Sequence, residues 1–114
     1  MNSGATFFSA MSRRILIVPD KFKWSLSALE AVGAIARGWA AACPGDSLVL
    51  LPMSDGGDGF GPVMAEALGL EEQIVKGIDA TGKARLTSWW LDSGAGQAVV
   101  ETAQSNGLAL LPKG

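Results

Sequence analysis

The fold is decided by residues 15–25, which read ILIVPDKFKWS. Its first four side chains are continuously apolar, which is typical of a strand buried on both faces in a parallel sheet. A second apolar run, residues 47–51, leads in the same way into residues 54–59, SDGGDG. In open α/β sheets, ligands bind where the carboxyl ends of adjacent strands meet. We therefore expect an α/β fold in which both polar clusters face one site.

Helical signals separate and follow these strands. Ser27 and Glu30 form a capping box, and an apolar stripe at helical spacing continues to Cys43, before Pro44. Residues 60–68 predict a short helix, with Gly69 in the left-handed conformation after it. A connection long enough to hold a helix makes the strands at 15–18 and 47–51 parallel.

Beyond Gly69 the pattern changes to strands joined by turns. Strands are expected at 73–76, 84–91 and 97–102, and turns at 79–82 and 92–96. The predicted organisation has three parts. A flexible leader at 1–14 precedes a flavodoxin- or Rossmann-like α/β unit at 15–76, which carries the nucleotide and substrate site. Residues 77–114 are the strand-rich beginning of a second α/β unit.

Composition excludes several classes of protein. The 114 residues carry a net charge of −2 and form no basic stripe, so we expect no nucleic-acid partner. The chain has no His, which excludes His-dependent triads and the usual zinc sites. The longest apolar stretch, residues 31–43, is too short to span a membrane. A cytoplasmic protein is expected, and the sequence carries no signal for an oligomeric state.

The glycine-rich segment at 54–59 has two interpretations. Gly56, Gly57 and Gly59 allow positive φ and a close approach of backbone amides to an anion. Asp55 and Asp58 flank these amides, and a carboxylate 5 Å from a negative ligand repels it by about 3 kcal/mol at an effective dielectric of 20. A phosphate bound there would need Mg²⁺ between it and the two carboxylates. The alternative is a tight turn in which Asp55 or Asp58 caps the next helix.

The cluster after the first strand offers charged groups for a small polar ligand. The Asp20 carboxylate could orient a substrate, and the Lys21 and Lys23 ammonium groups could hold a carboxylate or phosphate. The alternative is an ordinary solvated ion pair. Ser25, like Ser27, is interpreted as helix-capping, because no activating base is near it in sequence. A third, weaker polar cluster is Glu101, which ends the last predicted strand, with Ser105 shortly after it.

Two further features have structural interpretations. Residues 77–84, GIDATGKA, nearly match the P-loop pattern, but Ala84 lacks the hydroxyl that binds Mg²⁺ and a strand follows in place of a helix. We predict a hairpin turn there. Trp89 and Trp90 place one indole on each face of a strand, which favours a core on one side and an interface or lid on the other.

Three segments resemble bacterial glycerate kinases of the first type: 19–28 (PDKFKWSLSA), 52–60 (PMSDGGDGF) and 101–110 (ETAQSNGLAL). The resemblance runs from residue 15 to about residue 112. It implies an ATP- and Mg²⁺-dependent kinase that phosphorylates a hydroxyl of D-glycerate to give phosphoglycerate, with the active site between two α/β domains. Members of that family are longer, so the resemblance also implies an amino-terminal fragment that is inactive alone.

The resemblance assigns roles to the polar clusters. Its implied catalytic residues are Asp20, Lys23 and Asp55, and Asp55 and Asp58 would hold the metal. The implied substrate contacts are Lys21, Ser25, Gly56, Gly57, Gly59, Glu101 and Ser105. An alternative from another class stays open, namely a stand-alone flavodoxin-like module that binds a phosphorylated small molecule or a partner without catalysis.

Overall fold

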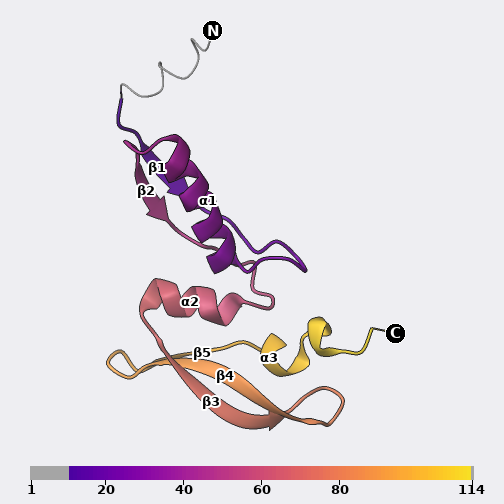
Figure 1. The fold of residues 1–114 in the computed structure, drawn as a ribbon. Coiled ribbons are helices and arrows are strands. Elements are labelled where there is room, and N and C mark those ends of the chain that lie inside the picture. Colours follow the sequence, from indigo (N-terminus) through magenta and orange to yellow (C-terminus); the bar gives the residue numbers. More distant parts are fainter. Residues whose placement is uncertain (1–10, 114) are drawn as a thin grey trace. The chain divides into compact units, whose positions relative to one another are not determined.

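The structure of the chain is a computed structural model that describes residues 11–113, so residues 1–10 of the predicted leader lie outside the described part (Figure 1). The chain divides into two compact units, the first ending at Met53 and the second beginning at Ser54. The predicted boundary after Lys76 falls within strand β3 (Glu71–Ile78). A parallel sheet with helices precedes antiparallel strands, which confirms the predicted α/β fold class.

The first unit contains a strand, a helix and a second strand. Strands β1 (Arg14–Ile17) and β2 (Ser47–Leu50) pair in parallel, and helix α1 (Ala28–Ala42) connects them. The predicted capping box is confirmed: the Glu30 amide donates to Ser27 Oγ at 3.1 Å, and the Ser27 amide donates to Glu30 Oε2 at 2.8 Å. The Glu30 carboxylate accepts from the Ser27 amide and also from the Ser27 hydroxyl, at 2.9 Å, and these two bonds lower the pKa of Glu30.

The core of this unit lies between α1 and one face of the two strands. Its buried side chains are Ile17 of β1 and Ala28, Ala31 and Val32 of α1. Leu16, the neighbour of Ile17, points to the other face and is 58% exposed. The prediction that this strand is buried on both faces is therefore wrong for the described residues, because α1 covers one face and no other described element of this unit covers the second.

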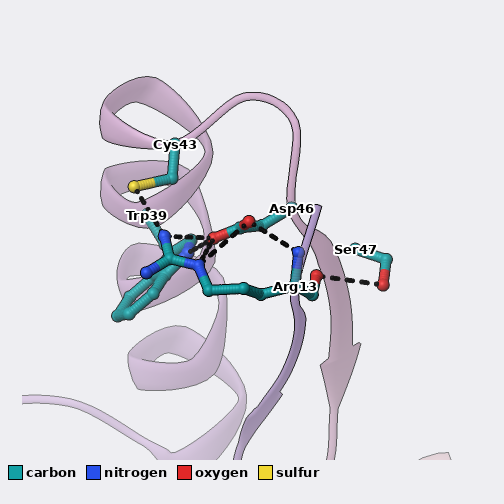
Figure 2. Close-up of polar contacts among 5 residues, drawn as sticks. All are labelled: Arg13, Trp39, Cys43, Asp46 and Ser47. Atoms are coloured by element: carbon teal, nitrogen blue, oxygen red, sulfur yellow. Dashed lines mark hydrogen bonds and ion pairs between the residues drawn. The ribbon is translucent and has the colours of Figure 1, made fainter. Parts of the chain in front are cut away.

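A polar cluster of Arg13, Trp39 and Asp46 connects the residue before β1 with α1 and with the loop before β2 (Figure 2). The Asp46 carboxylate accepts hydrogen bonds from the Arg13 amide at 3.0 Å, from Arg13 Nη2 at 2.7 Å and from Trp39 Nε1 at 2.9 Å. The Arg13 guanidinium lies 5.8 Å from the centroid of the Trp39 ring. The Asp46 side chain is only 3% exposed, and the side-chain hydrogen bond from Arg13, followed by that from Trp39, lowers its pKa to about 2.

The depressed pKa of Asp46 predicts a specific loss of stability in acid. Because the folded pKa lies below the ordinary value of 3.8, the stabilisation is fully present above about pH 4 and is lost as the pH falls toward 2. Urea unfolding between pH 2 and pH 6 measures the free energy of unfolding. As the pH is lowered, this free energy should fall more steeply for the wild type than for Asp46→Asn. The lowered pKa of Asp79 adds a slope to both proteins, so their difference isolates Asp46. Identical slopes would contradict this assignment.

The second unit is an antiparallel three-stranded meander with helices. Strands β3, β4 (Ala84–Asp92) and β5 (Gln97–Val100) pair in that order. Helix α2 (Phe60–Leu68) precedes them, and α3 (Ala103–Asn106) and the 3₁₀ turn η1 (Leu108–Leu110) follow. The predicted range of α2 and the left-handed Gly69 are confirmed. The last strand is shorter than predicted, and sequence analysis missed α3.

Trp90 forms the centre of this unit. Its indole is 4% exposed, and Val63 of α2 is also buried. Trp89, which points to the opposite face of β4, is half-buried. The predicted core on one side of this tryptophan pair is confirmed. Within residues 11–113, none of the helices combines the length and apolar character that crossing a bilayer requires.

Candidate functional site

The first polar loop follows β1 and folds into a tight turn. The Phe22 amide donates to the Leu26 carbonyl at 2.8 Å, and the Leu26 amide donates to the Phe22 carbonyl at 3.0 Å. Trp24, at the tip, has φ of 68°. This left-handed conformation is uncommon for a bulky residue and is favoured at functional or strained sites. The turn presents its polar side chains just beyond the carboxyl end of β1.

The predicted site residues of this loop are accessible. Asp20 and Lys23 are exposed and Lys21 is half-buried. The Asp20 carboxylate accepts the Lys21 amide at 2.6 Å, and Lys23 Nζ lies 5.7 Å from the centroid of the Trp24 ring. The hydroxyl of Ser25 donates to the Phe22 carbonyl at 3.2 Å, so this serine stabilises the turn. The prediction that Ser25 caps a helix is wrong, because the N-cap residue of α1 is Ser27.

The glycine-rich loop at 54–59 has the backbone conformation that its composition predicts. Gly56 and Gly59 have φ of 99° and 91°. The Gly56 amide donates to Ser54 Oγ at 3.2 Å, and the Gly57 amide donates to Asp55 Oδ1 at 3.3 Å. The carboxylates of Asp55 and Asp58 belong to exposed residues, so a ligand can reach them.

Neither aspartate occupies the N-cap position of α2, so the alternative in which Asp55 or Asp58 is the N-cap residue is wrong. The N-cap residue is Gly59, which has no side chain to accept a hydrogen bond. The acceptor is Glu101, which follows β5: its Oε1 accepts the Gly59 amide at 3.0 Å and its Oε2 accepts the Gly61 amide at 2.8 Å. Glu101 is 5% exposed. The structure thus brings Glu101 to the glycine-rich loop, as a buried anchor.

Gly61 is a residue of this site that sequence analysis missed. A Cβ at Gly61 would lie 1.8 Å from Cζ3 of Trp90, so only glycine lets α2 approach the indole this closely. Glycine is a poor helix former, costing roughly 1 kcal/mol relative to alanine in a helix interior. A glycine within the predicted helix at 60–68 was therefore the sequence signal that this position needs close packing. Trp90 and Glu101 together support the start of α2.

Ser105 lies elsewhere in the second unit. Its hydroxyl donates to the Thr102 carbonyl at 3.4 Å, and its own carbonyl accepts the Ala80 amide at 3.3 Å. Ala80 belongs to the turn between β3 and β4, which confirms that residues 77–84 form a hairpin and not a P-loop. Asp79 organises this turn, and hydrogen bonds from Thr81 and Lys83 lower its pKa.

The acidic side chains at 54–59 suit a metal ion that a nucleotide helps to hold. Mg²⁺ is usually bound through one or two carboxylates together with substrate phosphates and water. Asp55 and Asp58 supply that number. Among residues 11–113, no group of three or more acidic or cysteine side chains could form an all-protein metal site. Asp20 belongs to the first unit and Asp55 and Glu101 to the second, and their meeting at one site stays a prediction.

The comparisons with known proteins decide the family. A profile described as the glycerate kinase family matches residues 15–114. The chain belongs to the glycerate kinase family. Every predicted site residue lies within the matched part.

Individual members of the glycerate kinase family agree with this result. The chain is 38% identical over 99 residues to a glycerate kinase of Halalkalibacterium halodurans and 33% identical over 99 residues to glycerate 2-kinase of Escherichia coli. In both comparisons, the match covers 87% of this chain and 26% of the relative. The chain thus spans about a quarter of the length of these relatives.

A solved structure agrees as well. The crystal structure of a protein provisionally described as glycerate kinase 2 from Salmonella typhimurium LT2 is 33% identical, with a TM-score of 0.72. The match covers 90% of this chain and 28% of that chain.

Proposed function

We propose that a chain of the relatives' length carrying these residues transfers the γ-phosphoryl group of ATP to a hydroxyl of D-glycerate, giving phosphoglycerate. The observation that carries this proposal is the family match over residues 15–114, which includes all three polar segments. Glycerate is then the small-molecule partner, and a cytoplasmic location follows from the same proposal. No role for nucleic acid or a membrane is needed.

The first polar loop would bind glycerate. Phosphoryl transfer depends on positioning and charge neutralisation more than on covalent catalysis. The ammonium groups of Lys21 and Lys23 complement the carboxylate of glycerate or a transferring phosphate, and the Asp20 carboxylate orients the hydroxyl that is phosphorylated. Ser25 adds a hydroxyl beside them. The exposure of Asp20, Lys23 and Ser25 supports these roles.

The glycine-rich loop would hold the metal and the phosphates. Asp55 and Asp58 are the residues that would bind Mg²⁺, which supplies positive charge to the phosphate oxygens when it is bound. Gly56 and Gly57 would approach a ligand through their backbone, since they carry no Cβ. Gly59 and Ser105 are weaker candidates for direct contact, because the Gly59 amide is held by Glu101 and Ser105 lies beside the β3–β4 turn.

An ADP-release assay tests this proposal. The 114-residue chain and a version of the relatives' length are each supplied with ATP, Mg²⁺ and D-glycerate, and ADP is measured with a coupled enzyme system. We expect glycerate-dependent ADP only from the longer version, because the 114-residue chain spans about a quarter of its relatives. A longer version that binds ATP and releases no ADP with glycerate would refute the proposed activity.

A further inference from the structure

We propose that Glu101 is a positioning residue, which fixes the end of the glycine-rich loop at 54–59 and does not contact the substrate. The kinetic part of this inference rests on the proposed function; the structural part stands without it. Its starting point is the amino end of α2, where the N-cap residue Gly59 leaves the helix without a side-chain cap. The first amides of a helix need acceptors from elsewhere.

Glu101 supplies both acceptors, from 42 positions beyond Gly59 and 40 positions beyond Gly61. Each carboxylate oxygen accepts one amide, from Gly59 at 3.0 Å and from Gly61 at 2.8 Å. Such charge-assisted bonds are stronger than neutral ones, and the positive end of the helix dipole favours the negative charge there. Because Glu101 is 5% exposed, its two oxygens are used within the protein.

Three more amides in and beside the loop also have acceptors within the chain. Ser54 Oγ accepts the Gly56 amide, Asp55 Oδ1 accepts the Gly57 amide, and the Gly57 carbonyl accepts the Phe60 amide at 3.1 Å. An anion that used the Gly59 amide would have to displace a buried carboxylate. Glu101 therefore sets the path of the backbone that carries Asp55. The exposed carboxylates of Asp55 and Asp58 are the groups of this loop that a ligand can reach.

This geometry requires a carboxylate of the length of glutamate. Glu101→Gln keeps the shape of the side chain but presents an NH₂ group to one of the two amides, so one hydrogen bond is lost. Glu101→Asp keeps the charge, but its shorter side chain cannot reach both amides. Asp92 offers a matched control, because its Oδ1 also accepts two amides, those of Gly94 and Ala95, in the exposed β4–β5 turn.

Amide hydrogen exchange on the 114-residue chain, measured by NMR, tests the structural part. In the unaltered chain, the Gly59 and Gly61 amides should exchange about 10 to 100 times more slowly than an unprotected glycine amide. In Glu101→Gln and Glu101→Asp, their exchange should accelerate by at least about tenfold, while the β3–β4 amides keep their rates. Asp92→Asn should accelerate Gly94 and Ala95 only. Unprotected Gly59 and Gly61 amides in the unaltered chain would overturn the proposal.

Kinetics on a version of the relatives' length separate positioning from substrate contact. Glu101→Gln should lower kcat by about tenfold or more while KM for D-glycerate changes less than about twofold, since the displaced loop carries Asp55. A large rise in KM with unchanged kcat would show that Glu101 contacts the substrate, and would overturn the proposal. If the unaltered longer version does not phosphorylate glycerate, the proposed function fails, and the exchange result still decides whether Glu101 fixes the loop.

Discussion

Replacing Trp90 by alanine is expected to lower the free energy of unfolding of the second unit by about 3–5 kcal/mol, the range for removing a large aromatic side chain from a core. The indole is 4% exposed and lies against Gly61 at the start of α2. Urea unfolding measures the loss, and native-state hydrogen exchange of the β3 and β4 amides assigns it to this unit. Trp89→Ala is the control, and it should cost clearly less because Trp89 is only half-buried.

The contact between Trp90 and Gly61 can be tested in isolation with a double-mutant cycle. Gly61→Ala alone should cost about 1–3 kcal/mol, because its methyl group would overlap the indole. In the Trp90→Ala background the same change should cost much less, since the space is vacant. Additive losses in the double variant would mean that these residues are not in contact, contrary to the structure.

Asp55→Asn is expected to reduce glycerate phosphorylation by about 100- to 1000-fold in a version of the relatives' length, the range for removing one electrostatic group that acts in the transition state. The neutral amide would also weaken binding of Mg²⁺, so more Mg²⁺ should be needed for half-maximal turnover. The measurement is the rate of ADP release at several Mg²⁺ concentrations.

Glu66→Gln is the matched control for this change. Glu66 is an exposed carboxylate on α2, close in sequence to the loop and outside the proposed site. Its replacement should leave both turnover and Mg²⁺ dependence unaltered. If Asp55→Asn behaves in the same way as this control, then Asp55 neither binds the metal nor contributes to the reaction.

Sequence patterns predicted well those structural features that depend on residues close together in the sequence. The Ser27 capping box, the range of α2, the left-handed Gly69 and the β3–β4 hairpin all depend on residues within a few positions of one another. The parallel pairing of β1 with β2 followed from the length of the connection. The polar loops themselves were also found this way, because strands run directly into them.

The remaining features depend on contacts between distant residues. No local pattern shows that Glu101 caps a helix that begins 41 positions earlier, at Phe60, or that Gly61 is needed to make room for Trp90. The same holds for Asp46, whose partners are Arg13, just before β1, and Trp39, in α1. Burial of β1 was overestimated, because an apolar run does not reveal how many of its faces its own unit covers.

The central claim is that this chain carries part of a glycerate kinase site, and ³¹P NMR of the reaction mixture tests it most directly. With a version of the relatives' length, ATP, Mg²⁺ and D-glycerate, we predict a new phosphomonoester resonance from phosphoglycerate that grows in step with ADP. That resonance should be absent without glycerate and strongly reduced with Asp55→Asn. Conversion of ATP to ADP and inorganic phosphate alone, or unchanged ATP, would contradict the account.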